Sequence, residues 1–367
     1  MQSIKDVTIL EIVNPNAPVH LRIASAMATK LLADLGIRVI RIVPPGNDIL
    51  EGIQPLLPDG TSAIGRFLNT SKLILKTKSE ADRIESVLRI VETGVSAVLL
   101  EEGDPLHDAL LASETSIVEI ATWPRGREST GSDSEFTILA ASGLLDIIGD
   151  PLREPLRLGG HQSSYAAGLS AFTATMVALA QTDTGAGPSR ARISLIETAI
   201  WINWKAVAGV HNGDVMPTRP GAMADFQIFS CLDGWFAFVF TPNEFNRVRA
   251  MFDGVDLSDL PIDDQPSLRA HIKTLTERIA PWFTKRSREE IFEIAQGHGI
   301  PAGPVYSPRD LLSDRQYESR SFLTSLETAH RSTVRMPRIP LSWNGTRFDP
   351  SSSQKIELDE LLGKGRP

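Results

Sequence analysis

A histidine and a serine stand three residues apart in His161-Gln162-Ser163-Ser164, at the start of an apolar stretch. The Ser164 hydroxyl is a poor nucleophile by itself, because its pKa lies far above neutrality, so it needs a general base. His161 could be that base if both residues belong to one helix, since positions i and i+3 share a helix face. The simpler interpretation is that Ser164 caps the helix, a role that suits serine. Ser164 and His161 are therefore candidate catalytic residues, with capping as the alternative.

Other chemistries lack their motifs. The turn after the first expected strand, Asn14 to His20, contains no glycine, so the dinucleotide-binding fingerprint is missing there. The chain has no phosphate-binding Walker loop and no Gly-x-Ser-x-Gly nucleophile elbow. Its seven histidines and its one cysteine, Cys231, do not show the spacing of metal ligands. The sequence disfavours hydride transfer, serine hydrolysis and metal-dependent catalysis, and we expect no metal cofactor.

The first third of the chain alternates between the hydrophobic periods of strands and helices. Short apolar runs rich in branched residues predict buried strands, and apolar residues every three or four positions predict helices between them. The expected strands are 7–13, 38–43, 72–76, 95–100 and 116–120, and the first helices are 23–35 and 80–91. This alternation predicts an α/β fold with a Rossmann-like, doubly wound parallel sheet.

The middle of the chain changes character. Long helices are expected at 136–148, 163–181 and 194–210, followed by a linker rich in Gly and Pro at 211–225. Beyond it, Leu232-Asp233-Gly234 between two apolar runs predicts a hairpin, and three helices follow at 243–252, 267–283 and 287–297. We therefore expect a large domain from 1–210 with 331–367, and a smaller α+β domain from 226–330.

Charge and composition limit the class of partner. The net charge is −8, which argues against nucleic acid as the main partner, because phosphate binding needs a basic surface. A single cysteine excludes an intrachain disulfide and suits a reducing cytoplasm, which is the expected location. The uninterrupted apolar runs, such as Val98–Leu100 and Trp235–Phe240, are too short to cross a bilayer, so we expect no membrane association.

Four groups of residues, taken in chain order over nearly the whole chain, resemble CoA-transferase family III. This family includes formyl-CoA transferase, carnitine CoA-transferase and α-methylacyl-CoA racemase. The groups are 30–41 with 44–48, then 141–144 with 149–151, 155–162 and 166–168, then 184–187 with 193–197, and last 299–305 with 320–322.

The resemblance implies a Rossmann-like large domain made from both chain ends, a smaller central domain, and an interlocked dimer of two ring-shaped chains. It implies that coenzyme A, as an acyl-CoA, and a carboxylic acid are the ligands. In such enzymes an aspartate at a helix start attacks the thioester and passes through anhydride and aspartyl-CoA intermediates. That aspartate lies four residues ahead of a glycine that lets the ligand approach. Counting back from Gly168 reaches Ser164 instead of an aspartate.

Further family positions are changed or kept only in part. The histidine used by the racemase branch is replaced by Ser134, so racemization is disfavoured. The resemblance implies that Leu75 and Lys78 contact CoA. The alternative, of equal weight, is that Leu75 is only a strand residue and Lys78 only a solvated lysine. Where the family shows Glu-Asn-Phe and then an arginine, this chain has Glu101-Glu102-Gly103 and His107. Two carboxylates beside a CoA phosphate would repel it.

Two functional hypotheses follow for this chain. In the first it is a CoA-transferase-family protein that acts on or binds an acyl-CoA with Ser164 at the nucleophile position. In the second it is a non-catalytic subunit, paired with a homologue that carries the aspartate, or a ligand-binding protein without transfer activity. A homodimer and such a heterodimer are both expected assemblies. A carboxylate such as Asp150 or Glu197 within hydrogen-bond distance of Ser164 would favour transfer, and a closed apolar surrounding would favour binding alone.

Overall fold

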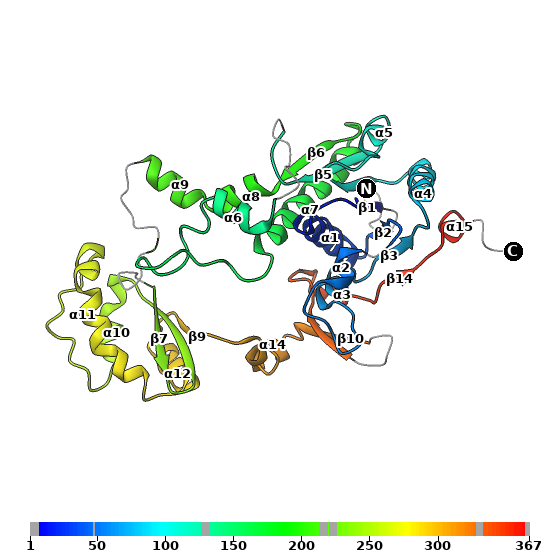
Figure 1. The fold of residues 1–367 in the computed structure, drawn as a ribbon. Coiled ribbons are helices and arrows are strands. Elements are labelled where there is room, and N and C mark those ends of the chain that lie inside the picture. The colour runs from blue at the N-terminus through cyan, green and yellow to red at the C-terminus, as the bar shows by residue number, and fades with distance from the viewer. Residues whose placement is uncertain are drawn as a thin grey trace. The chain divides into compact units, whose positions relative to one another are not determined.

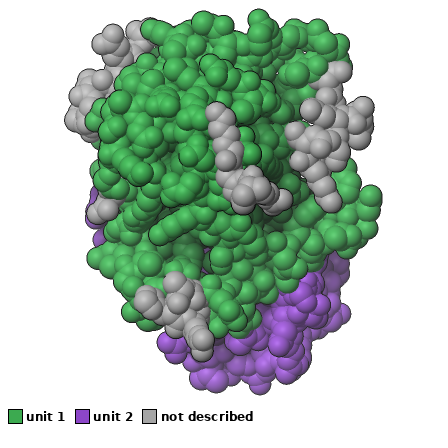
Figure 2. All heavy atoms as spheres, turned by 90° about the vertical axis from the view of Figure 1, so that its right-hand side faces the viewer, with its two compact units in different colours: residues 1–148, 156–214, 322–367 green, residues 149–155, 215–321 purple. Residues whose placement is uncertain are grey.

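The computed structural model describes residues 7–46, 48–125, 133–212, 219, 226–327 and 333–363. The chain divides into two compact units (Figure 2). Unit 1 comprises the described residues of Met1–Ile148, Leu156–Asp214 and Phe322–Pro367, and unit 2 those of Gly149–Pro155 and Val215–Ser321. These limits differ from the expected domains in the short segment 149–155 and in the point where the chain returns to unit 1. Most of the expected linker 211–225 lies outside the described residues.

Unit 1 is built on a seven-stranded parallel sheet (Figure 1). Its strand order is β14-β3-β2-β1-β4-β5-β6. The strands are β1 (Thr8–Ile12), β2 (Arg38–Val43), β3 (Leu73–Lys76), β4 (Ala97–Glu101), β5 (Ser116–Ala121), β6 (Arg190–Ser194) and β14 (Gln354–Lys355). The doubly wound α/β fold and its first five strands are thereby confirmed. The two outermost strands, β6 and β14, were not expected, because three of the five residues of β6 are polar and β14 is a polar strand of two residues.

Helices and two small antiparallel sheets complete unit 1. The helices are α1 (Val19–Asp34), α2 (Ile49–Gly52), α3 (Ala63–Leu68), α4 (Glu80–Glu92), α5 (His107–Leu111), α6 (Glu135–Ala141), α7 (Gln162–Asp183), α8 (Leu195–Ile202), α9 (Trp204–His211) and α15 (Leu358–Leu361). Strand β10 (Leu323–Glu327) pairs with β11 (Thr333–Pro337), and β12 (Ser342–Trp343) with β13 (Thr346–Arg347).

Two of the expected helices were wrong in extent. The helix expected over 136–148 is α6, which ends at Ala141, because the chain turns at Gly143 with a positive φ of 76°. The helix expected over 194–210 is two helices, α8 and α9, which meet at Asn203. Each boundary falls at a residue that readily leaves the helical conformation.

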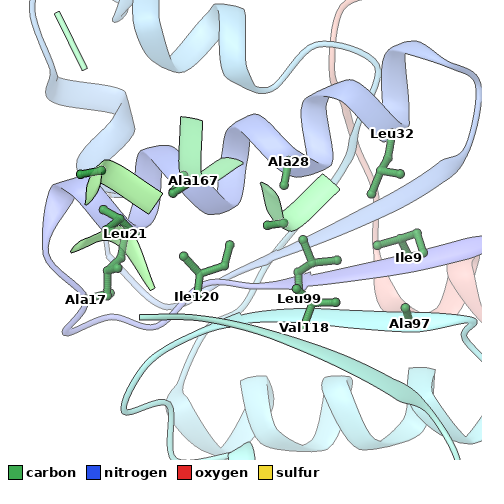
Figure 3. Packing of buried hydrophobic residues seen from close by; sticks show 14 of the residues in the cluster. Ile9, Ala17, Leu21, Ala28, Leu32, Ala97, Leu99, Val118, Ile120 and Ala167 are labelled. Carbon is green, nitrogen blue, oxygen red and sulfur yellow. The ribbon is translucent and has the colours of Figure 1, made fainter. Parts of the chain in front are cut away.

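The main core of unit 1 lies between the sheet and the helices α1 and α7. Figure 3 shows side chains of α1, among them Leu21 and Ala28, facing strand residues such as Leu99 and Ile120, with Ala167 of α7 beside them. The small residues along both helices allow their backbones to approach closely. A Cβ added at Gly168 would lie 2.7 Å from Met27 Cβ and 2.8 Å from the Ala24 carbonyl oxygen. Gly168 is buried, so the expectation that it makes room for a ligand is wrong: it makes room for α1.

Helix α7 is also the one described helix whose length and apolar composition would suit a membrane span. No single uninterrupted apolar run marks this helix in the sequence. In the fold, α7 packs along α1 and against β5, with its remaining face exposed.

A buried network of ion pairs joins the strands of the sheet to α1. Glu11 pairs with Arg41 and, at 3.0 Å, with Lys72. Asp48 pairs with Arg41 at 2.5 Å and with Arg22 at 2.8 Å, and Arg22 continues to Glu101 at 2.6 Å. The side chains of these six residues are almost fully buried, and three positive charges balance three negative ones. Paired charges of this kind avoid the large penalty of an isolated buried ion.

Unit 2 has an aromatic core of its own. Its sheet contains β7 (Phe226–Cys231), β8 (Gly234–Val239) and β9 (Ala302–Pro304), and β7 and β8 form the expected hairpin. Phe229 stacks on Phe283 with 4.2 Å between the ring centroids. The other elements are η3 (Pro242–Glu244), α10 (Phe245–Met251), α11 (Gln265–Phe283), α12 (Arg288–Gly297), α13 (Pro308–Leu311) and α14 (Arg315–Ser319).

Candidate functional site

The order of the strands marks one edge of the sheet as a place for a ligand. Strand β1 lies between β2 and β4 in the sheet. The chain goes from β1 to β2 on one side and from β4 to β5 on the other, so the order of the strands reverses between the carboxyl ends of β1 and β4. Asn14, just after β1, joins the two ends: its backbone N–H donates to Glu101 Oε2 at 3.0 Å, and its side-chain amide donates to the Glu102 carbonyl at 2.8 Å. Helix α1 begins at this edge, since it follows β1. Helix α7 begins there too, because it leads back into the parallel strand β6.

Ser164 lies in the first turn of α7, and its side chain is 0% exposed. Its backbone N–H donates to Glu135 Oε1 at 3.1 Å. Its hydroxyl has no hydrogen-bond partner within the described part of the chain. The capping interpretation is therefore wrong, because the N-cap residue of α7 is His161 and the orphan N–H of Ser164 is satisfied by Glu135.

His161 faces Glu135 rather than Ser164. Its Nδ1 lies 2.8 Å from Glu135 Oε2, and because a carboxylate only accepts hydrogen bonds, Nδ1 carries the proton. The ring also meets the edge of the Tyr165 ring, with 6.3 Å between centroids. The structure thus does not bring His161 and Ser164 into a base–nucleophile pair, since the histidine precedes the helix and its Nδ1 is engaged elsewhere.

Glu135 is the acidic residue that meets the start of α7. Besides the bonds to Ser164 and His161, its Oε1 accepts a hydrogen bond of 2.6 Å from the Ser163 hydroxyl. Burial raises the pKa of the Glu135 carboxyl, but the hydrogen bonds from Ser163, Ser164 and His161 outweigh it, so the pKa lies below its ordinary value. Glu135 is therefore ionised at neutral pH.

Glu135 was not among the residues expected at the site. The available signal was a helix start, since Ser134 and Thr137 cap each other at the beginning of α6. The two carboxylates expected as candidates, Asp150 of unit 2 and Glu197 of unit 1, have other surroundings. Asp150 accepts the backbone N–H of Leu152 at 2.7 Å, and Glu197 is exposed on α8.

His20 is a second buried polar residue at this edge. Its Nε2 lies 2.9 Å from Thr122 Oγ1, at the end of β5, and its Nδ1 has no partner among the described residues. Burial lowers the pKa of His20 to about 4, although the nearby charges of Glu135 and Asp133 act in the opposite direction. The imidazole is therefore neutral at pH 7, and it lies close enough to Glu135 to feel its charge.

The two expected CoA contacts have different surroundings. Leu75 is buried in the core beneath the sheet, with Ile40 and Val87 in the same cluster, and this leaves no free surface for an adenine ring. The expected contact at Leu75 is therefore not supported by its position. Lys78 is exposed just before α4, and its backbone N–H donates to Asp82 Oδ2 at 2.7 Å. Its ammonium group is available to an anion at this edge.

The two carboxylates at the end of β4 do not form a bare negative patch. Glu101 is buried and paired with Arg22. Glu102 pairs with Arg192, which also holds Glu119 at 2.5 Å. The expected repulsion of a phosphate is reduced, because each carboxylate faces a guanidinium group. Within the described residues no group of three or more His, Cys, Asp or Glu side chains is placed to hold a metal ion.

Comparisons with known proteins agree with this fold. The model of CoA-transferase family III matches residues 117–354, more than half of the chain. The probable CoA-transferase Rv1866 of Mycobacterium tuberculosis is 24% identical over 82% of this chain, but this chain covers only 40% of it. Subunit BbsE of succinyl-CoA:(R)-benzylsuccinate CoA-transferase from Thauera aromatica is 23% identical over 92% of this chain and 93% of that protein.

A solved structure has the same fold. The crystal structure of a CAIB/BAIF family protein from Brucella suis superposes with a TM-score of 0.79 at 18% identity, and covers 98% of this chain and 97% of its own. The resemblance found in the sequence is confirmed, and this chain belongs to CoA-transferase family III.

Proposed function

We propose that this chain binds an acyl-CoA at the carboxyl edge of the seven-stranded sheet and takes part in moving CoA between carboxylic acids. The observation that carries the proposal is the ionised carboxylate of Glu135, which meets the start of α7 at the Ser164 position. Family membership supports a CoA thioester as ligand, and the relatives' names refer to CoA-transferases.

Ser164 does not act as a nucleophile in this proposal. A serine hydroxyl needs a base to remove its proton, and the hydroxyl of Ser164 contacts none in the described part of the molecule. Its position corresponds to that of the family aspartate by the count from Gly168. In this proposal the site lies where the family site lies, but a serine stands in place of the aspartate that accepts the acyl group.

A second candidate function is that of a subunit in a heteromeric transferase. The observation that favours it is the large apolar surface of α7, α8 and α9, where Trp201 is 75% and Trp204 is 64% exposed. A groove of about 1300 Å³ beside α7, lined mainly by apolar residues such as Phe172 and Met176, adds to this surface. Exposed apolar area of this kind marks a protein interface. We propose that a second chain covers it, either another copy in an interlocked dimer or a homologue that carries the aspartate.

Two measurements test the proposed function. Isothermal titration with CoA and with succinyl-CoA is expected to show binding, and Lys78→Ala is expected to weaken it several-fold, because a phosphate loses a cation. The control Lys285→Ala changes an exposed lysine of unit 2 and is expected to leave the affinity unchanged. Absence of binding by the wild-type chain, alone and with an aspartate-bearing homologue, would refute the function.

The oligomeric state separates the two candidate functions. Light scattering of the purified chain is expected to show a dimer if a second copy covers α7 to α9. A monomer that becomes a heterodimer only on addition of a homologue, with CoA exchange appearing at the same time, would favour the subunit function instead.

A further inference from the structure

We propose that Glu135 is the acyl acceptor of this chain and takes the part of the aspartate that is missing at Ser164. This inference rests on the proposed function and adds the residue that performs the covalent step. The first observation is the position of the carboxylate. Glu135 is on α6, yet its carboxylate reaches the first turn of α7, where it contacts Ser164, four residues before Gly168.

The donors around Glu135 leave its two oxygens in different states. Oε1 accepts from the Ser163 hydroxyl at 2.6 Å and from the Ser164 backbone N–H at 3.1 Å. Among the described residues, Oε2 has a hydrogen bond to the ring of His161 alone, at 2.8 Å. The N-terminal end of the 22-residue helix α7 adds a positive partial charge on the same side. Oε1 is therefore anchored, and Oε2 is the oxygen that can react.

Access to Oε2 passes His161. Ser163 and Ser164 are buried, whereas the side chain of His161 is 21% exposed. His161 precedes the regular part of α7, so its ring can turn without disturbing the helix. A rotation of this one side chain opens Oε2 to a thioester while both hydrogen bonds to Oε1 remain.

Two polar atoms without partners lie at the same helix ends and fit a ligand oxygen. They are His20 Nδ1 on α1 and Ser164 Oγ on α7. Gly168 touches Ala24, so the preceding turns of the two helices, which carry Ser164 and His20, come together at the carboxyl edge of the sheet. In the tautomer in which Thr122 donates to Nε2, the neutral His20 carries its proton on Nδ1 and can donate it to a carbonyl oxygen. A buried donor left unpaired is destabilising, so a ligand that pairs with it is favoured.

The reaction balances with no further reagent. Oε2 attacks the thioester carbon, the C–S bond breaks, and the CoA thiolate leaves, which forms an acyl anhydride on Glu135. The thiolate then attacks the Glu135 carbonyl carbon, the first carboxylic acid leaves as its anion, and glutamyl-CoA remains. A second carboxylate attacks glutamyl-CoA, and the thiolate it releases takes the new acyl group, which restores the Glu135 carboxylate.

The experiment is mass spectrometry of the full chain after incubation with succinyl-, acetyl- and formyl-CoA and rapid quenching, followed by peptide mapping. We expect a CoA adduct on Glu135 in the wild type and loss of that adduct in Glu135→Gln. Glu197→Gln changes an exposed carboxylate of α8 and is the matched control, expected to keep the adduct.

The outcomes separate the inference from the function on which it rests. Binding of CoA by titration together with no adduct, or with an adduct on another acid, overturns the role of Glu135 and leaves the proposed function standing. No binding of CoA overturns the function itself, and the inference with it. Circular dichroism of Glu135→Gln shows whether a lost adduct reflects chemistry or folding, and the mapping of the wild-type adduct does not depend on that variant.

Discussion

Gly168→Ala tests whether α1 and α7 hold the candidate site through close backbone contact. The new methyl group would lie 2.7 Å from Met27 Cβ and 2.8 Å from the Ala24 carbonyl oxygen, whereas ordinary contacts of a Cβ begin at 3.4 Å. The carbonyl belongs to the backbone of α1 and cannot turn aside. The two helices must therefore move apart by several tenths of an ångström.

The net effect follows from two opposing contributions. Overpacking a tight contact costs about 1–3 kcal/mol. Alanine in place of glycine inside a helix gains about 0.5–1 kcal/mol. We expect Gly168→Ala to lower the free energy of unfolding by about 1–2 kcal/mol, measured by urea denaturation followed by circular dichroism. CoA binding should weaken as well, because Ser164 lies one helical turn from Gly168 and moves with it.

The control is Gly52→Ala, at a helical glycine of unit 1 that has no atom within 4 Å of an added Cβ. It should leave the stability unchanged or slightly raised. If Gly168→Ala were as stable as the wild type, the close approach of α1 and α7 would not be what requires glycine, and the packing argument would fail.

Two further predictions concern buried charge. The pKa of His20 is about 4 in the folded chain and 6.5 in the unfolded chain. Between these two pH values the unfolded chain binds a proton that the folded chain does not, so the free energy of unfolding falls by about 3 kcal/mol as the pH falls from 6.5 towards 4. His20→Gln cannot be protonated and should show a flatter dependence of unfolding free energy on pH over this interval, and a slope equal to that of the wild type would contradict the argument. Lys72→Met removes one of the two cations that pair with buried Glu11 and should cost about 1–3 kcal/mol in urea denaturation, because Glu11 Oε2 loses a charged donor while Arg41 still pairs with Oε1. Lys76→Ala breaks only an exposed pair with Glu51 and should cost less than about 1 kcal/mol, so similar losses for the two variants would refute the distinction.

The sheet of unit 1 and the hairpin of unit 2 could be predicted because both depend on local pattern. The run from Val7 to Val13 is apolar and branched, and Asp233-Gly234 supplies the turn that its neighbours need. Strand β6 (Arg190–Ser194) escaped prediction, since it has only two apolar residues, Ala191 and Ile193, and it joins the sheet by pairing with β5. The pattern of neighbouring residues does not show which distant strand a segment pairs with.

The candidate site could be predicted only in its location. The approximate start of α7 and the importance of Ser164 follow from the sequence, but the partner of Ser164 does not. Glu135 is 29 residues away in the chain, and only folding brings it to the helix start. For the same reason, the cations that balance Glu101 and Glu102 were not foreseen, because they come from other elements.

The buried ion pairs of Glu11, Arg41, Asp48, Arg22, Glu101 and Lys72 also restrict how this protein can diverge or be redesigned. Each member has a neighbour of opposite sign, so a neutral replacement at one position creates a demand for a matching replacement next to it. Mutant libraries that vary these positions one at a time should return few folded clones, whereas libraries that vary a pair together should return many more.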